Sequence, residues 1–163
     1  MQIIKDAQII EDNWQLLTIE TTLDAISAQD NVILPLSLWL ENKNQFENRQ
    51  NKTGIWLNST EEIESIAENV AEIPLIALEF PSFTDGRHYS SARILRERYH
   101  YQGEIRAIGD VLKDQLFAMH RCGFNSFVVK EGKDINNALL SLTDFSETYQ
   151  AAVVQPLPLF KRL

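Results

Sequence analysis

Cysteine is nearly missing from this sequence: Cys122 is the only one in 163 residues. A single cysteine excludes an internal disulfide and any metal cluster held by several cysteines, and it fits a reducing, cytoplasmic setting. Long apolar runs are missing too, since none approaches the ~20 residues that span a bilayer. The first residues, Met1 to Asp6, lack the basic region and apolar core of a signal peptide. We therefore expect a cytoplasmic protein that does not enter a membrane.

Basic residues and cofactor motifs are scarce as well. The chain has 15 Lys and Arg against 23 Asp and Glu, a formal net charge of -8, whereas binding to nucleic acid requires clustered basic side chains. It contains no glycine-rich dinucleotide fingerprint, no phosphate-binding Walker loop and no serine elbow. Its histidines do not have the spacing of metal ligands. The sequence thus predicts no nucleic-acid partner and indicates no particular cofactor.

What the sequence does contain is a regular alternation of apolar runs and amphipathic stretches between residues 75 and 130. Leu75–Phe80 is an almost unbroken apolar run, typical of a strand covered on both faces. Helical periodicity follows over 89–99 and 112–119, and further short strands are predicted at 105–109 and 126–130. Such short connections between alternating strands and helices indicate right-handed βαβ units and a parallel sheet.

The flanking segments continue this pattern within one predicted domain, residues 1–163. We expect a short antiparallel meander within 1–30, strands at 32–36 and 54–57, helices at 37–50, 61–70, 135–142 and 144–152, and a flexible segment over 42–52. The prolines of the tail predict an extended segment over 153–163. The predicted fold class is therefore α/β: a single domain with a mainly parallel sheet of consecutive βα units, either an open flavodoxin-like sheet or a partial barrel, and short antiparallel N-terminal strands.

One candidate site follows from the loop after the central strand. Ligands of parallel α/β sheets bind outside the carboxyl ends of the strands, where helix N-termini also point. A guanidinium and free helix N–H groups at that edge would bind a small oxyanion or a phosphate group. The candidate anion-binding residues are Thr84, Gly86, Arg87, Arg93 and Arg96. Ordinary ion pairs, of Asp85 with Arg87 and of Arg93 with Glu97, are the alternative use of the same side chains.

Carboxylates also follow successive strands. Glu79, Asp85 and Asp110 are weak candidates for a shared Mg²⁺ site, because this cation prefers oxygen ligands. Asp85, Asp110 and Lys113 are the candidate catalytic residues of an enzyme built on that edge, with Lys130 as a further base or electrophile. The alternative is structural, with Asp85 as a turn former and Asp110 as a helix N-cap.

Two further features have no clear chemistry. The tail carries Leu157, Leu159 and Phe160, which could dock on another protein or cover this protein's own surface. Cys122 stands at the predicted end of a helix, where the helix dipole disfavours a thiolate, so we expect a buried thiol.

Several motifs point together to one family. They are Leu34-Pro35-Leu36, Gly54-Ile55-Trp56-Leu57, Phe80 to Arg87, Ala92 to Tyr99, Gly109 to Leu116, Arg121-Cys122-Gly123-Phe124 and Gln155 to Phe160. With these motifs the chain resembles a bacterial family of unknown function, DUF934, whose members are often labelled as oxidoreductases of sulfite reduction. The resemblance covers most of the chain after about residue 30. It implies a pathway and a partner, sulfite reductase, and names no catalytic residue.

We therefore expect an accessory protein of assimilatory sulfate or sulfite reduction, which binds a small oxyanion or sulfite reductase at the carboxyl edge of the strands. Two alternatives stay open. One is a metal-assisted α/β enzyme that uses the strand-end carboxylates, and the other is a structural subunit of a homo-oligomer.

Overall fold

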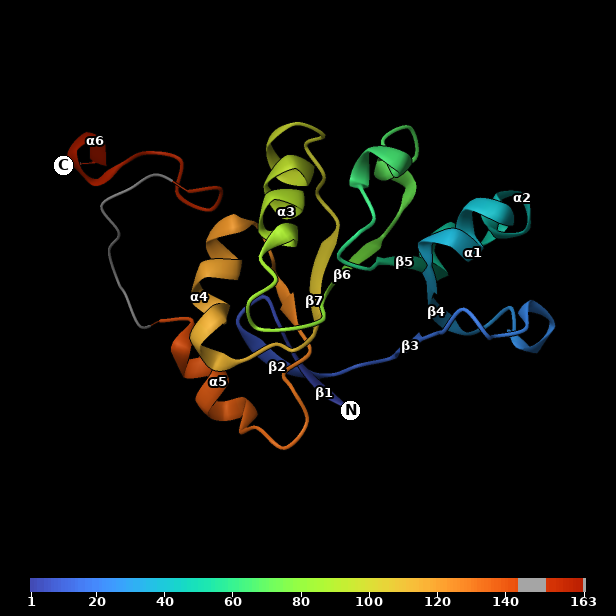
Figure 1. Cartoon of the computed structure of the whole chain (residues 1–163), viewed down its shortest axis with the longest axis horizontal. Helices are drawn as coiled ribbons and strands as arrows, with labels where there is room; N and C mark the ends of the chain where they lie inside the picture. The colour runs from blue at the N-terminus through green and yellow to red at the C-terminus, as the bar shows by residue number, and fades with distance from the viewer. Residues whose placement is uncertain (144–151, 163) are drawn as a thin grey trace.

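The sheet runs through the whole molecule. A computed structural model describes residues 1–143 and 152–162, and in this part the strand order is β2-β1-β8-β7-β6-β5-β4-β3 in one curled sheet (Figure 1). The strands are β1 (Gln2–Lys5), β2 (Gln8–Glu11), β3 (Trp14–Leu16), β4 (Asn31–Pro35), β5 (Thr53–Leu57), β6 (Leu75–Phe80), β7 (Glu104–Gly109) and β8 (Ser126–Phe127). Neighbours from β3 to β8 pair in parallel, whereas β1 pairs antiparallel with β2 and β8. A mixed α/β chain with a mostly parallel sheet and antiparallel N-terminal strands is thus confirmed.

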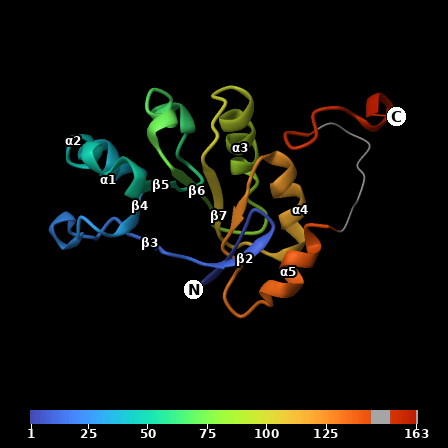
Figure 2. The ribbon, with the colours of Figure 1, turned by 180° about the vertical axis from the view of Figure 1, so that it is seen from behind.

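The N-terminal strands do not form one meander. β1 and β2 make a hairpin beside β8, whereas β3 pairs in parallel with β4 at the other edge of the sheet. The meander predicted within residues 1–30 is therefore wrong for its third strand, which pairs with β4 and not with β1 or β2. Alternating short apolar runs predict strands, but they do not say which edge each strand will join. Only Asp12 and Asn13 separate β2 from β3, a reach of about 10 Å, so the curl of the sheet brings its two edges close together on one side (Figures 1 and 2). We call residues 12–14 the crossing segment, because they pass over this side of the sheet from one edge to the other.

Helices and turns connect the parallel strands. They are α1 (Leu36–Glu41), α2 (Lys43–Phe46), α3 (Arg87–Glu97), α4 (Lys113–Cys122), α5 (Ile135–Ser141) and α6 (Leu159–Arg162), with the 3-10 turns η1 (Leu23–Ala25), η2 (Glu47–Lys52), η3 (Ile63–Ile66) and η4 (Val70–Glu72). In the described part of the chain, no helix has the length and apolar character needed to cross a membrane.

Four predicted segments differ from the structure. Residues 61–70 form the turns η3 and η4 instead of an α-helix, because Ile63 and Ile66 are both buried and lie three apart, the spacing that a 3-10 turn places on one side. Residues 42–52 contain α2 and η2, and the strand predicted at 126–130 shortens to β8. The tail ends in α6, which begins directly after Pro158, a position that proline tolerates. The helix predicted at 144–152 falls on residues 144–151, outside the described residues.

The two faces of the sheet are covered differently. On one face, α3 and α4 bury Leu95 and Leu116 against strand residues such as Ile76 and Phe80 in the main core. Right-handed crossovers between successive strands place their helices on this same face. The other face carries a smaller apolar cluster, Ile33, Leu75, Ala77 and Ile108, packed against Trp14, Trp56 and Val128. We call it the open face, and the crossing segment with Trp14 covers part of it.

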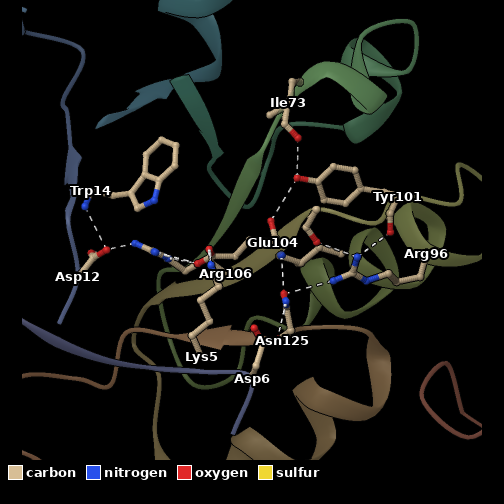
Figure 3. Close-up of polar contacts among 12 residues, drawn as sticks. Lys5, Asp6, Asp12, Trp14, Ile73, Arg96, Tyr101, Glu104, Arg106 and Asn125 are labelled. Carbon is tan, nitrogen blue, oxygen red and sulfur yellow. Dashed lines mark hydrogen bonds and ion pairs between the residues drawn. The ribbon is translucent and has the colours of Figure 1, made fainter. Parts of the chain in front are cut away.

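A buried ionic cluster lies on this open face (Figure 3). Arg106 in β7 is 2% exposed; its Nη1 lies 2.9 Å from Asp12 Oδ2 and its Nη2 lies 2.8 Å from Glu104 Oε1. Lys5 Nζ of β1 lies 2.7 Å from Glu104 Oε2. Burial raises the pKa of Glu104, but Arg106 and then Lys5 outweigh it and hold this pKa below its ordinary value. The cluster therefore fastens both β1 and the crossing segment to the centre of the sheet.

We expect Asp12→Ala to lower the free energy of unfolding by about 3 kcal/mol, because it leaves a buried guanidinium short of a partner. The neighbouring Glu11 is the matched control: its carboxylate is 72% exposed and pairs with the N-terminal amine at the surface, so Glu11→Ala should cost no more than about 0.5 kcal/mol. Urea unfolding followed by circular dichroism measures both. Equal losses for the two variants would contradict the role of the buried pair.

Candidate functional site

The loops that follow β6, β7 and β8 meet at the carboxyl ends of these strands, and we call this end of the sheet the rim. In the loop after β6, the Phe83 N–H donates to Asp110 Oδ2 at 3.0 Å, and the Phe83 carbonyl accepts from Gln115 Nε2 at 3.3 Å. The Ser82 and Thr84 hydroxyls lie 3.2 Å apart. While its backbone is held on both sides, the Phe83 side chain is 54% exposed. The loop therefore presents an aromatic ring to solvent from a fixed position.

Asp110 joins the three loops of the rim. Before it, Gly109 has a φ of 92°, and a Cβ there would collide with the Phe80 carbonyl, so the turn requires glycine. The Asp110 N–H donates to that carbonyl at 2.7 Å, and Lys130 Nζ donates to Asp110 Oδ1 at 2.7 Å. The hydrogen bond from Lys130 lowers the pKa of Asp110 below its ordinary value. This carboxylate thus fixes the loop after β6 and pairs with a cation after β8.

The prediction that Asp110 caps the next helix is wrong. α4 begins at Lys113 with Leu112 at the N-cap position, and the Leu112 N–H donates to Gln115 Oε1 at 3.1 Å. Lys113, a candidate catalytic residue, is exposed at the first turn of α4. It lines a cavity of about 290 Å³ together with Val129 and Lys133.

Asp85 and Arg87 form a forked ion pair at the start of α3. Arg87 Nε and Nη2 lie 3.1 and 3.0 Å from the two carboxylate oxygens, and the Arg87 N–H donates to Oδ1 at 3.2 Å. Desolvation raises the pKa of Asp85, but the bonds from Arg87 outweigh it and hold this pKa below its ordinary value. Gly86 occupies the N-cap position of α3. The structure therefore has the predicted alternative, an ordinary ion pair between Asp85 and Arg87. An anion that binds Arg87 must compete with the Asp85 carboxylate.

A buried histidine connects α3 to the end of β5. His88 is 1% exposed; its Nε2 lies 2.9 Å from the Asn58 carbonyl and its Nδ1 lies 3.1 Å from the Ser91 hydroxyl. Burial lowers the pKa of His88 below its ordinary value of 6.5. A neutral ring satisfies both contacts, since Nε2–H then donates to the carbonyl and Nδ1 accepts from the hydroxyl.

The structure does not bring Arg96 to the rim. A helix that follows a parallel strand runs back along the sheet. The end of α3 therefore lies near the amino ends of the strands, at the opposite end from Arg87. There the Arg96 guanidinium donates to backbone carbonyls and to the Asn125 amide oxygen (Figure 3). The carbonyls are those of Tyr101, Gly103 and Gly123, at 2.6, 2.9 and 3.0 Å from the nearest guanidinium nitrogen. Arg96 thus links the loop before β7 to the end of α4.

Two more predicted residues lie along the helices, away from the rim loops. Arg93 pairs with Glu97 at 3.4 Å, on the exposed side of α3. Cys122, expected as a buried thiol, is half-buried, and this burial raises the pKa of the thiol.

The candidate metal ligands do not converge. Asp85 faces Arg87 and Asp110 faces Lys130, whereas Glu79 is half-buried, where desolvation and the charge of Glu61 raise its pKa. In the described residues, no group of three or more His, Cys, Asp or Glu is placed to hold a metal ion.

The tail is described only in part. The Val153 N–H donates to the Arg121 carbonyl at 3.0 Å, so the tail touches the end of α4. Leu157 is 51% exposed. The side chains of Leu159 and Phe160, the other predicted docking residues, lie outside the described part.

Sequence reasoning gave no role to three residues that organise the rim: Phe83, Gln115 and His88. A signal existed for Gln115, which stands three residues after Leu112, the spacing of a capping box. Nothing local marks Phe83, because its partners, Asp110 and Gln115, come from distant segments. For His88, only the common three-residue spacing to Ser91 is local, and its other partner, Asn58, lies 30 residues away.

We expect stability to fall as the pH drops through and below about 6.5, the ordinary pKa of histidine. Because the folded pKa of His88 is depressed, the unfolded chain binds more protons in this range, so the contribution of the neutral ring is complete above pH 6.5 and is lost below it. For one group, the slope is at most about 1.4 kcal/mol per pH unit.

Urea unfolding between pH 5 and 8 measures this dependence, and His88→Gln should flatten it. The exposed His100 provides the control, since His100→Asn should leave the slope unchanged. The lowered pKa values of Asp85, Glu104 and Asp110 act below about pH 5, at the lower limit of this range. The raised pKa of Glu79 acts above 4.5 with the opposite sign and is the same in both proteins, so the difference between wild type and His88→Gln isolates the histidine. A slope that survives in His88→Gln would contradict the assignment.

Comparison with known proteins agrees with the resemblance seen in the sequence. A family model described as "Bacterial protein of unknown function (DUF934)" matches residues 54–160, more than half of the chain. No curated protein and no solved structure matched the chain. The matched region contains the loop with Phe83, Asp85 and Arg87, as well as Asp110. This chain therefore belongs to the DUF934 family of bacterial proteins of unknown function.

Proposed function

We propose that this protein is an accessory protein of assimilatory sulfate or sulfite reduction, and that it docks on sulfite reductase through the rim. The pathway and the partner come from the resemblance to proteins labelled in this way. The choice of surface rests on the geometry of the loop after β6.

The exposed Phe83 is the observation that carries the proposal. Protein interfaces are anchored by a few aromatic or arginine side chains surrounded by polar residues. Phe83 is 54% exposed between the Asp85–Arg87 and Asp110–Lys130 ion pairs, and both its N–H and its carbonyl are already bonded. A loop whose backbone is already fixed loses little conformational entropy on binding, which favours the Phe83 ring as an anchor.

A small oxyanion at Arg87 is the second binding mode that we expect at this edge. Arg87 is 62% exposed, so an anion can reach it. The Asp85 carboxylate already occupies the Nε and Nη2 side of the guanidinium, and its negative charge repels an incoming anion, which weakens this mode relative to docking. The metal-assisted enzyme has no comparable support, since Asp85 and Asp110 each face a cation.

We also infer that the fold is the partial barrel of the two predicted alternatives. The parallel strands follow one another from β3 to β8 without a reversal, whereas a flavodoxin-like sheet reverses its strand order at a switch point. A sequential order with curl favours a barrel-like arrangement.

For docking, we expect the protein to bind purified sulfite reductase and Phe83→Ala to weaken this binding about 30-fold, the usual loss for an interface anchor. Biolayer interferometry with immobilised reductase measures it. Leu140→Ala is the matched control, because Leu140 on α5 is 66% exposed and lies outside the rim; it should bind as the wild type does. Leu157→Ala tests the tail separately. Absence of wild-type binding, or equal losses for Phe83 and Leu140, would contradict docking through the rim.

For the anion mode, we expect Asp85→Asn to strengthen sulfite binding, because it frees the guanidinium fork of Arg87 from a competing charge. Isothermal titration with sulfite measures this, and Arg93→Gln, a change outside the rim, is the control. If neither the wild type nor Asp85→Asn binds sulfite, the oxyanion mode is wrong while docking is unaffected.

A further inference from the structure

A hollow lies at the rim between the first turns of α4 and α5. It is the cavity of about 290 Å³ that Lys113 lines, and Leu112 and Val129, which are both half-buried, form its apolar wall. Pockets for drug-sized ligands have volumes of roughly 300 to 1,000 Å³. This hollow lies at the lower limit of that range, so its size suits a single large side chain.

Two hydrogen-bonded links join the hollow to the loop after β6. The first is Gln115, whose amide oxygen accepts the Leu112 N–H at 3.1 Å and whose amide nitrogen donates to the Phe83 carbonyl at 3.3 Å. The second is Asp110, which accepts the Phe83 N–H at 3.0 Å and Lys130 Nζ at 2.7 Å. Lys130 directly follows the second residue of the apolar wall. Both sides of the hollow are therefore tied to the backbone of Phe83.

A partner protein that covers Phe83 also covers the hollow. A standard interface buries roughly 800 Å² of each protein, which is a disc with a radius of about 16 Å. Only one amide group separates the Leu112 N–H from the Phe83 carbonyl, so the hollow lies well inside such a disc around Phe83. Because the cores of interfaces are packed as densely as protein interiors, we expect a side chain of the partner to fill the hollow.

The charges around the hollow favour an apolar occupant. They are two of each sign: Lys113, Lys133, Asp114 and Asp134. The Asp134 carboxylate already accepts two backbone N–H groups of α5, at 2.9 and 3.4 Å. A charged side chain in the hollow would meet attraction and repulsion together. An apolar side chain, in contrast, gains from covering the half-buried wall, while the exposed lysines keep their ammonium groups in water.

We propose that one large apolar side chain of sulfite reductase, a leucine, methionine or phenylalanine, enters this hollow when the rim docks. The inference rests on the proposed docking and names the chemistry of the partner surface. Anchor residues of the two sides of an interface tend to lie together. Phe83 is the anchor that this protein contributes, and the hollow receives one from the reductase. Two such contacts fix the orientation of the complex, which a single exposed ring does not.

Filling the hollow tests this proposal. Asn137 lines the hollow and is exposed, and its backbone N–H keeps its bond to Asp134 in any variant. We expect Asn137→Trp to occupy the hollow and to weaken the binding of purified sulfite reductase at least about tenfold in biolayer interferometry. Asn136→Trp is the matched control. Asn136 is also exposed and bonded to Asp134 but is not part of the lining, so this variant should bind within about twofold of the wild type.

A small probe tests the hollow without the reductase. Isobutanol has the shape of a leucine side chain, and methyl NMR spectra of protein labelled at leucine and valine report where it binds. We expect saturable shifts of the Leu112 and Val129 methyl signals, which Asn137→Trp should abolish. Leu140 on α5 is the control, because it is 66% exposed outside the hollow, and its signals should not saturate.

The two assays separate the failure of this inference from the failure of docking itself. If the wild type does not bind sulfite reductase, the docking proposal is wrong and this inference falls with it. If the wild type binds and Phe83→Ala weakens the binding, but a folded Asn137→Trp variant binds normally, docking stands and the hollow has no part in it. Equal losses for Asn136→Trp and Asn137→Trp, or methyl signals that isobutanol does not shift, also overturn the inference.

Discussion

A buried arginine in the centre of the sheet constrains both of its edges. Arg106 is 2% exposed, and a guanidinium keeps its charge, so it requires acidic partners inside the protein. One partner, Glu104, lies two residues away in the same strand, and the other, Asp12, belongs to the segment between β2 and β3. Because Asp12 must reach Arg106, the segment crosses the open face. Trp14 then packs on the apolar cluster there, and β3 arrives at the far edge.

The rim follows from the parallel order of β6, β7 and β8. Adjacent parallel strands end side by side, so the loop after the middle strand can contact both neighbours. Asp110 occupies this middle position, where one oxygen accepts the Phe83 N–H and the other accepts Lys130. A carboxylate used in this way positions a loop and is not free to bind a metal. The parallel strands do bring the three loops together, as predicted from the sequence, but Asp110 uses this proximity to position the loop after β6.

The sequence predicts the elements of this fold better than their partners. The strand Leu75–Phe80 and the stop at Gly123 were predictable because apolar runs and glycine act locally. The crossing of Asp12 to Arg106 and the contact of His88 with Asn58 join distant segments, and no local pattern encodes them. Arg96 is a different case. Nine residues of helix separate it from Arg87, or about 13 Å of rise, which already excludes a shared site.

The two ends of the sheet differ in how their charges are satisfied, and this difference favours the rim as the docking surface. At the rim, acids and cations neutralise one another, so a partner protein can cover them without burying an unpaired charge, and the exposed Phe83 ring gains from burial. At the amino ends of the strands, the acids Glu47 and Glu72 are exposed and form no ion pair within residues 1–143 or 152–162. Water solvates these carboxylates, so a protein that covered this end would have to supply cations for them. Because the two places lie at opposite ends of parallel strands, a partner on the rim leaves these acids in water.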